Sequence, residues 1–103
     1  MQSVNNILFL DIETVPQYPN FQAMPEDARP FWNKKALQIL KGDDREDPET
    51  IYPRAGIYAE FGKIICISCG VITGTGVERR LIMKSFCGDD EKTILSGFCD
   101  ILT

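Results

Sequence analysis

The feature that most constrains this chain is an apolar run, residues 7–10, that leads directly into two acids, Asp11 and Glu13. Apolar residues occupy the positions that would point to each face of a strand, a pattern typical of a central strand buried on both faces. In a strand, residues two apart point to the same face, with β-carbons roughly 6.5–7 Å apart. We therefore expect both carboxylates on one face at the end of a buried strand.

These two acids suggest a metal ion. Placing carboxylates at the end of a buried strand costs free energy unless a cation pairs with them. No Lys or Arg precedes Arg29, and carboxylate oxygens are the ligands that hard divalent cations take. We therefore expect Asp11 and Glu13 to share a divalent cation. The alternative is a solvated turn in which Pro16 ends the strand.

Two segments resemble a known family. Residues 9–16 are similar to the first motif of the DEDD-type 3′–5′ exonucleases, an apolar strand followed by Asp-x-Glu-Thr. The trailing Val15 and Pro16, with residues 60–64 leading into a later strand, resemble the stand-alone bacterial group related to the exonuclease (proofreading) domain of family B DNA polymerases. The resemblance implies a ribonuclease H-like α/β fold that removes nucleotides from a 3′ end as nucleoside monophosphates.

The resemblance also implies roles for individual residues. Asp11 would bridge two catalytic metals, Glu13 would ligate one of them, and Thr14 would approach the terminal nucleotide. The metals would be Mg²⁺ or Mn²⁺, and two such ions activate a water and stabilise the leaving oxygen. The implied substrate is the 3′ end of single-stranded DNA, with RNA as an alternative.

Two other functions stay open at this point. A haloacid-dehalogenase-like phosphohydrolase also places an acid at the end of its first strand, but its pattern has Asp where this chain has Glu13. Its core is a parallel sheet, which the later hairpin fits poorly. The second alternative is a non-enzymatic interaction domain without a catalytic site.

The family needs two further acidic motifs, which the 103 residues lack. We therefore expect the N-terminal part of one exonuclease domain, truncated before its later parallel strands and inactive alone. The strand at residues 7–12 would then lack a neighbour, and the last helix would lack part of its packing. We expect a homo-oligomer with that strand or that helix at the contact.

The pattern of elements is consistent with this layout. We expect a strand at residues 7–12, a helical insertion at 17–61, a hairpin at 63–86 and a helix at 89–102. The three strands, 7–12, 63–73 and 77–86, should form an antiparallel meander joined at Gly74–Gly76. In the insertion, Asp27 should cap a helix that Gly42 ends, residues 43–47 should form a loop, and a short helix within 51–60 should break near Pro53.

The last helix and two aromatic residues complete the expected core. Acids at residues 89–91 should open that helix, whose buried stripe is Ile94, Leu95, Phe98 and Leu102. In the insertion, Phe31 and Trp32 are interpreted as packing residues and not as a base-stacking platform.

Composition limits the remaining possibilities. The net charge of −4 lacks the basic footprint of a free-standing nucleic-acid binder, although bound metals would reverse the local sign. The absence of His removes Ser-His-Asp chemistry. We expect no membrane segment and a cytoplasmic protein. Cys66 and Cys69 have zinc-knuckle spacing but Cys87 and Cys99 do not, so reduced, buried thiols are expected without disulfides.

Overall fold

The computed structural model describes residues 4–103, which divide into two compact units. We call residues 4–13 with Ile64–Thr103 the sheet unit, and Thr14–Lys63 the helical unit. No helix within residues 4–103 is both long and apolar enough to cross a membrane. The elements, with η for a 3-10 helix, are η1 (Val4–Asn6), β1 (Leu8–Pro16), η2 (Phe21–Ala23), α1 (Arg29–Leu40), α2 (Pro48–Ile51), η3 (Tyr52–Ile57), β2 (Gly62–Thr73), η4 (Gly76–Glu78), β3 (Arg80–Cys87) and α3 (Glu91–Leu102).

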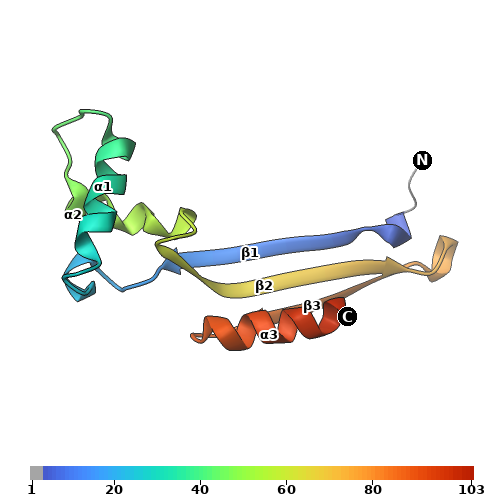
Figure 1. Ribbon diagram of the computed structural model, residues 1–103. Helices are drawn as coiled ribbons and strands as arrows, with labels where there is room; N and C mark the ends of the chain where they lie inside the picture. Colours follow the sequence, from blue (N-terminus) through green and yellow to red (C-terminus); the bar gives the residue numbers. More distant parts are fainter. Residues whose placement is uncertain (1–3) are drawn as a thin grey trace. The chain divides into compact units, whose positions relative to one another are not determined.

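The sheet unit is built on three antiparallel strands in the order β1-β2-β3 (Figure 1), which confirms the predicted meander. Residues 66–73 of β2 pair with residues 80–87 of β3. The turn between them needs glycine: Gly74 has φ +79°, and a Cβ there would lie 2.6 Å from the Glu78 carbonyl oxygen. β3 begins at Arg80, later than the expected Val77, because η4 occupies the intervening residues.

The expectation that the first strand is central and buried on both sides is wrong. β1 is an outer strand of the sheet, paired with β2 alone among the described strands. Four of its apolar residues are 43–50% exposed: Leu8, Phe9, Leu10 and Ile12. The apolar run therefore predicts a strand with the composition of a sheet interior, but it does not indicate which layers cover that strand.

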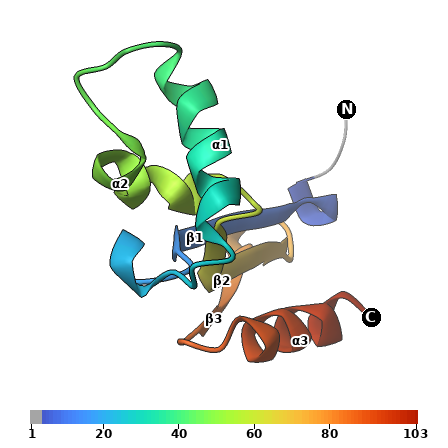
Figure 2. The same ribbon diagram turned by 60° about the vertical axis from the view of Figure 1, so that its left-hand side comes forward.

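The last helix begins where the acids predicted. Asp90 is the N-cap of α3 and accepts a hydrogen bond from the Lys92 N–H, while the Glu91 carboxylate accepts one from the Ile64 N–H in β2. Figure 2 shows α3 lying along one face of the sheet. Gly97 permits this close approach, because a Cβ there would lie 2.7 Å from the Phe86 ring.

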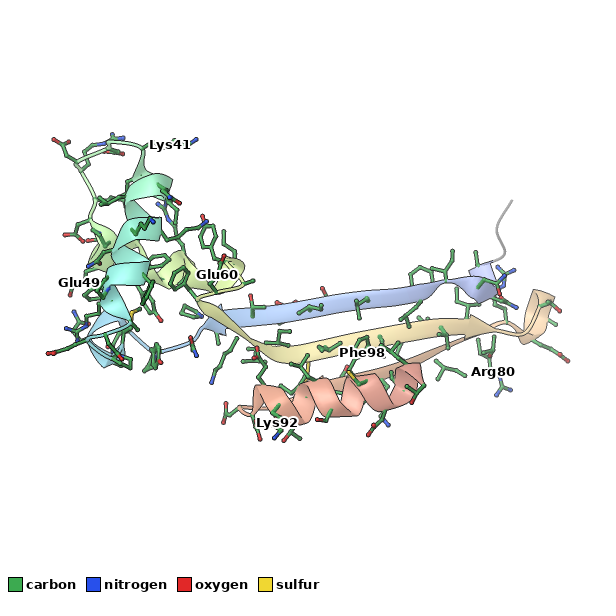
Figure 3. All side chains as sticks on the ribbon, in the orientation of Figure 1. Lys41, Glu49, Glu60, Arg80, Lys92 and Phe98 are labelled. Atoms are coloured by element: carbon green, nitrogen blue, oxygen red, sulfur yellow. A yellow bond between two sulfur atoms is a disulfide. The ribbon has the colours of Figure 1, made fainter. Side chains whose placement is uncertain are left out.

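The predicted buried stripe of α3 is only partly correct. Ile94 is buried and Phe98 is half-buried, on the strand side of the helix, while Lys92 points away (Figure 3). Leu95 and Leu102 are exposed. The stripe has the spacing of one helix face, but only Ile94 and Phe98 are covered.

The helical unit has a dense core around Trp32, as expected for a packing residue. The Trp32 indole N–H donates to the Pro48 carbonyl at 2.8 Å, and its ring meets Phe61 and Tyr52 edge-on at 5.1 and 5.4 Å between centroids. The six buried members of this core are Met24, Trp32, Ala36, Ile51, Tyr52 and Ala55.

The ends of the insertion helices differ in detail from the prediction. The N-cap of α1 is Ala28, and no side chain caps it, so the assignment of Asp27 as the cap is wrong. The helix ends at Leu40, followed by two positive φ angles, 51° at Lys41 and 85° at Gly42. The chain reaches α1 through a turn in which the Ala28 N–H bonds to the Pro25 carbonyl, which leaves Asp27 outside the cap position.

The acidic stretch that follows α1 forms a surface loop, as predicted. A hydrogen bond from the Arg45 side chain lowers the pKa of Asp43, and the two form an ion pair at 3.0 Å. Asp47 caps α2 by accepting the Thr50 N–H at 2.8 Å. The next helical stretch is broken between α2 and η3, close to the expected Pro53.

Of the four cysteines, only Cys69 follows the prediction of reduced, buried thiols. Cys66 and Cys87 form a disulfide between β2 and β3, where the strand register places them opposite each other. Cys69 is free and buried, and Cys99 is free and exposed. The sequence hid this pair because 21 residues separate the partners and only the register of the hairpin brings them together.

Candidate functional site

The two acids of the first motif lie on one face of β1 in the sheet unit. Asp11 lines a shallow apolar pocket of about 330 Å³ together with Phe9, Gly70, Leu81 and Met83. Gly70 pairs with Met83 in the sheet, so these two residues share one face. Glu13 follows Asp11 by two residues and shares its face.

α3 packs against one face of the hairpin. Gly97 of α3 packs on Phe86, and Phe86 lies opposite Ile67 on one face of the hairpin. Ser68 and Ser85 mark the other face, where their hydroxyls are 2.8 Å apart. The hydrogen bond from the Gln17 N–H to the Phe61 carbonyl fixes the register of β1 against β2, and that register places Asp11 opposite Ile67, on the face against which α3 packs.

The electrostatic setting of the acids differs from the one expected. Asp11 and Glu13 are both exposed. Within residues 4–103, neither carboxylate takes part in an ion pair. Since water can solvate both charges, the argument that burial forces a cation onto this pair does not hold. The pair is available to a cation, but it does not require one.

The described residues offer no larger ligand set. They contain no group of three or more His, Cys, Asp or Glu side chains placed to hold a metal ion. Asp11 and Glu13 can therefore supply two carboxylates to a hard cation, with water filling the other positions. The two-metal arrangement implied by the exonuclease resemblance needs more carboxylates than this face provides.

Thr14, the third residue of the motif, belongs to the helical unit and has a structural partner there. Its hydroxyl donates to the Gly56 carbonyl at 2.7 Å. The backbone is tight at this point, because a Cβ on Gly56 would lie 2.9 Å from the Val15 carbonyl carbon. The hydroxyl thus fixes the end of β1 to η3, and contact with a nucleotide stays a prediction.

The structure also shows a concave site that the sequence interpretation missed. Phe31, expected to be a packing residue, is 70% exposed and lines a pocket in the helical unit with Lys34, Lys35 and Gln38. The sequence carried a signal for this group, because the four residues are spaced as one face of a helix. Trp32, next to Phe31, points into the core instead.

Comparisons with protein-family models, with curated proteins and with solved structures give no match for this chain. The resemblance to the exonucleases therefore rests on residues 9–16 and 60–64 alone. What the structure itself establishes is a mixed α/β chain with a three-stranded antiparallel sheet.

Proposed function

We propose that Asp11 and Glu13 form the first acidic motif of a metal-dependent 3′–5′ exonuclease of ribonuclease H-like fold, acting on the 3′ end of single-stranded DNA. The observation that supports this best is the pair of exposed carboxylates on one face of β1, neither of which forms an ion pair with a described residue. An antiparallel β1-β2-β3 sheet agrees with the opening strands of that fold. Thr14 would lie beside the terminal nucleotide.

The donor set fits the implied metal in part. Asp11 and Glu13 would hold one Mg²⁺ or Mn²⁺ with water, because hard divalent cations take carboxylate and water oxygens. A pair of such ions activates a water and stabilises the leaving oxygen of a phosphodiester. With no third ligand group among residues 4–103, we propose that this chain alone has no measurable turnover and that hydrolysis requires the two further acidic motifs.

The antiparallel sheet weighs against the phosphohydrolase alternative. A haloacid-dehalogenase-like core places its first strand in a parallel sheet, whereas β1 and β2 are antiparallel. A non-enzymatic interaction domain remains the competing proposal, and it differs by giving the acidic pair no affinity for divalent cations.

Titration with Mn²⁺, followed by the loss of its free-ion EPR signal, tests the site. We expect weak binding, with a dissociation constant of roughly millimolar size. Asp11→Asn and Glu13→Gln should each remove it, while Asp44→Asn, which changes an exposed acid in a loop, should not. Equal binding by all three variants would remove the assignment and favour the interaction domain.

Activity provides the second test. The purified chain should leave a labelled single-stranded oligonucleotide intact in Mg²⁺ or Mn²⁺, and robust digestion would show that two carboxylates suffice. In a protein that combines this chain with the two missing motifs, Asp11→Ala should abolish hydrolysis without changing the circular dichroism spectrum. Retained hydrolysis in that variant would contradict the role of Asp11.

The cytoplasm is the proposed location, and the Cys66–Cys87 disulfide, which counts against it, makes this testable. Cytosolic proteins rarely keep disulfides, whereas oxidising compartments favour them. Rapid alkylation of cells followed by mass spectrometry should therefore find Cys66 and Cys87 as free thiols if the cytoplasm is correct. A fully oxidised pair would instead place the protein in an oxidising compartment.

A further inference from the structure

The pocket in the helical unit is large enough for a ligand. Its volume is about 470 Å³, and its lining includes Tyr18, Phe31, Lys34, Lys35 and Phe61. Sites for small molecules and cofactors span roughly 300–1,000 Å³. All the lining residues belong to the helical unit, so one unit forms the whole pocket.

The wall of this pocket carries an accessible aromatic ring. Phe31 exposes 70% of its surface, whereas the adjacent Trp32 exposes none. An exposed phenyl ring contributes little to folding, but it offers a face on which a nucleobase can stack. The wall behind it is fixed, because Phe61 and Tyr52 both line the pocket and both pack edge-on against Trp32.

The helix that presents this ring is basic, although the chain as a whole is acidic. α1 contains Arg29, Lys34 and Lys35 and no acid, against a net charge of −4 for the chain. Neither lysine takes part in an ion pair with another residue of the 4–103 segment. Lys35 lies with its Nζ 4.8 Å from the centre of the Tyr58 ring. Beside Phe31 there are thus two ammonium groups that form no ion pair with a described residue, an arrangement that matches a phosphate next to a base.

The remaining polar groups indicate how a nucleotide would lie. Gln17 and Gln38 line the pocket and can both donate to and accept from the edge of a base. Glu60, labelled in Figure 3, also lines it and would repel a phosphate. The phosphate therefore belongs at the lysines of α1, and the neutral base belongs against the aromatic wall.

We propose that this pocket binds one nucleotide of a single-stranded nucleic acid, with its base stacked on Phe31 and its phosphate held by Lys34 and Lys35. The choice of ligand rests on the proposed exonuclease function, which requires a single strand. The binding itself uses neither a metal nor the acidic pair of β1. In this proposal the insertion at residues 17–61 helps to hold the single-stranded nucleic acid.

Fluorescence anisotropy of a labelled oligothymidylate, titrated with the whole chain in EDTA at low salt, tests the stacking. Phe31→Ala should weaken binding by about 5-fold to 150-fold, the range for loss of one base–aromatic stack. Leu37→Ala should have no effect, because Leu37 is a 64% exposed residue of the same helix outside the pocket. Phe31→Trp should restore binding. The fluorescence of Trp32, the one tryptophan, serves as a second readout in the chain without the Phe31→Trp change.

The salt dependence tests the phosphate contacts. Lys34→Gln and Lys35→Gln should each lower the slope of log affinity against log salt by about 0.7, the value for one contact to a single strand. Lys41→Gln is the matched control, because Lys41 follows α1 (Figure 3) and is not among the residues that line the pocket.

Several results would overturn the inference. These are no binding by the wild-type chain, equal binding by Phe31→Ala and Leu37→Ala, or equal binding of an abasic oligomer or an acidic peptide. Binding of free thymidine monophosphate as tightly as the oligomer would identify a mononucleotide site instead. Because the Mn²⁺ titration contains no oligomer and the oligomer titration contains EDTA, a failure at the acidic pair and a failure at this pocket are distinguishable.

Discussion

The two units of this chain differ in how many of their apolar residues they bury. Of the nine buried apolar residues found within residues 4–103, six form the core of the helical unit around Trp32. The sheet unit contributes three: Ile67, Cys69 and Ile94. The exposed large apolar residues are distributed in the opposite way, with twelve in the sheet unit and three in the helical unit.

The difference follows from geometry. Helices joined by short loops can surround one large side chain on all sides, and Trp32 with its aromatic neighbours fills such a space. A sheet has two faces, and each needs a covering layer. α3 covers part of one face of the sheet and leaves Asp11 and Glu13 exposed. The sheet unit therefore exposes most of its large apolar residues, whereas the helical unit buries its apolar residues in a core of its own.

The largest effect should come from removing the centre of the helical core. Trp32→Ala should lower the free energy of unfolding by about 3–5 kcal/mol, because it leaves a cavity and an unpaired Pro48 carbonyl. Hydrogen exchange read by mass spectrometry should show the loss of protection concentrated in residues 14–63. Leu37→Ala, on the exposed side of the same helix, is the control. An equal loss of protection in β2 and β3 would break the comparison between the units.

A smaller effect should follow from charging the outer strand of the sheet. We propose that the chain self-associates through β1 or α3, because an exposed apolar edge strand can pair with another chain. Sedimentation velocity should find a homodimer or larger oligomer. Leu10→Lys, at a residue that is 50% exposed on β1, should raise the dissociation constant about tenfold or more, or roughly 1.4 kcal/mol.

Val77→Lys is the matched control for that experiment, because Val77 is a fully exposed apolar residue of η4 and belongs to neither β1 nor α3. It should leave the association unchanged. A wild-type chain that stays monomeric at high micromolar concentration would show that the apolar surface of the sheet unit does not drive self-association.

The smallest effects concern helix caps, which work alike in both units. The Thr93 hydroxyl bonded to Asp90, and the Thr50 N–H bonded to Asp47, hold the pKa of each carboxyl below its ordinary value. This stabilisation is present above about pH 4 and is lost as the pH falls through the lowered folded-state pKa. Asp90→Ala and Asp47→Ala should each lower the thermal midpoint slightly at pH 7 and hardly at pH 2. Asp44→Ala, which changes an acid that caps no helix, should not show this pH dependence.

Local sequence signals predicted much of this molecule. The three strands, the antiparallel meander and the Asp90 start of α3 follow from alternation, glycine turns and the chemistry of caps. Trp32 was correctly expected in the core. The cap of α1 was not predictable in the same way, because the turn at Pro25–Ala28 competes with Asp27 for that place.

The candidate sites show the same division between what a local sequence pattern predicts and what only the packing decides. That Asp11 and Glu13 share a face follows from the period of a strand, and the sequence alone determined it. Whether that face is buried depends on what packs against it, which no local pattern contains, and here the tertiary structure decided for exposure. The Cys66–Cys87 disulfide required the register of the hairpin. Phe31 and Trp32 are adjacent and chemically alike, and only the packing of α1 decided that one fills the core and the other faces a pocket.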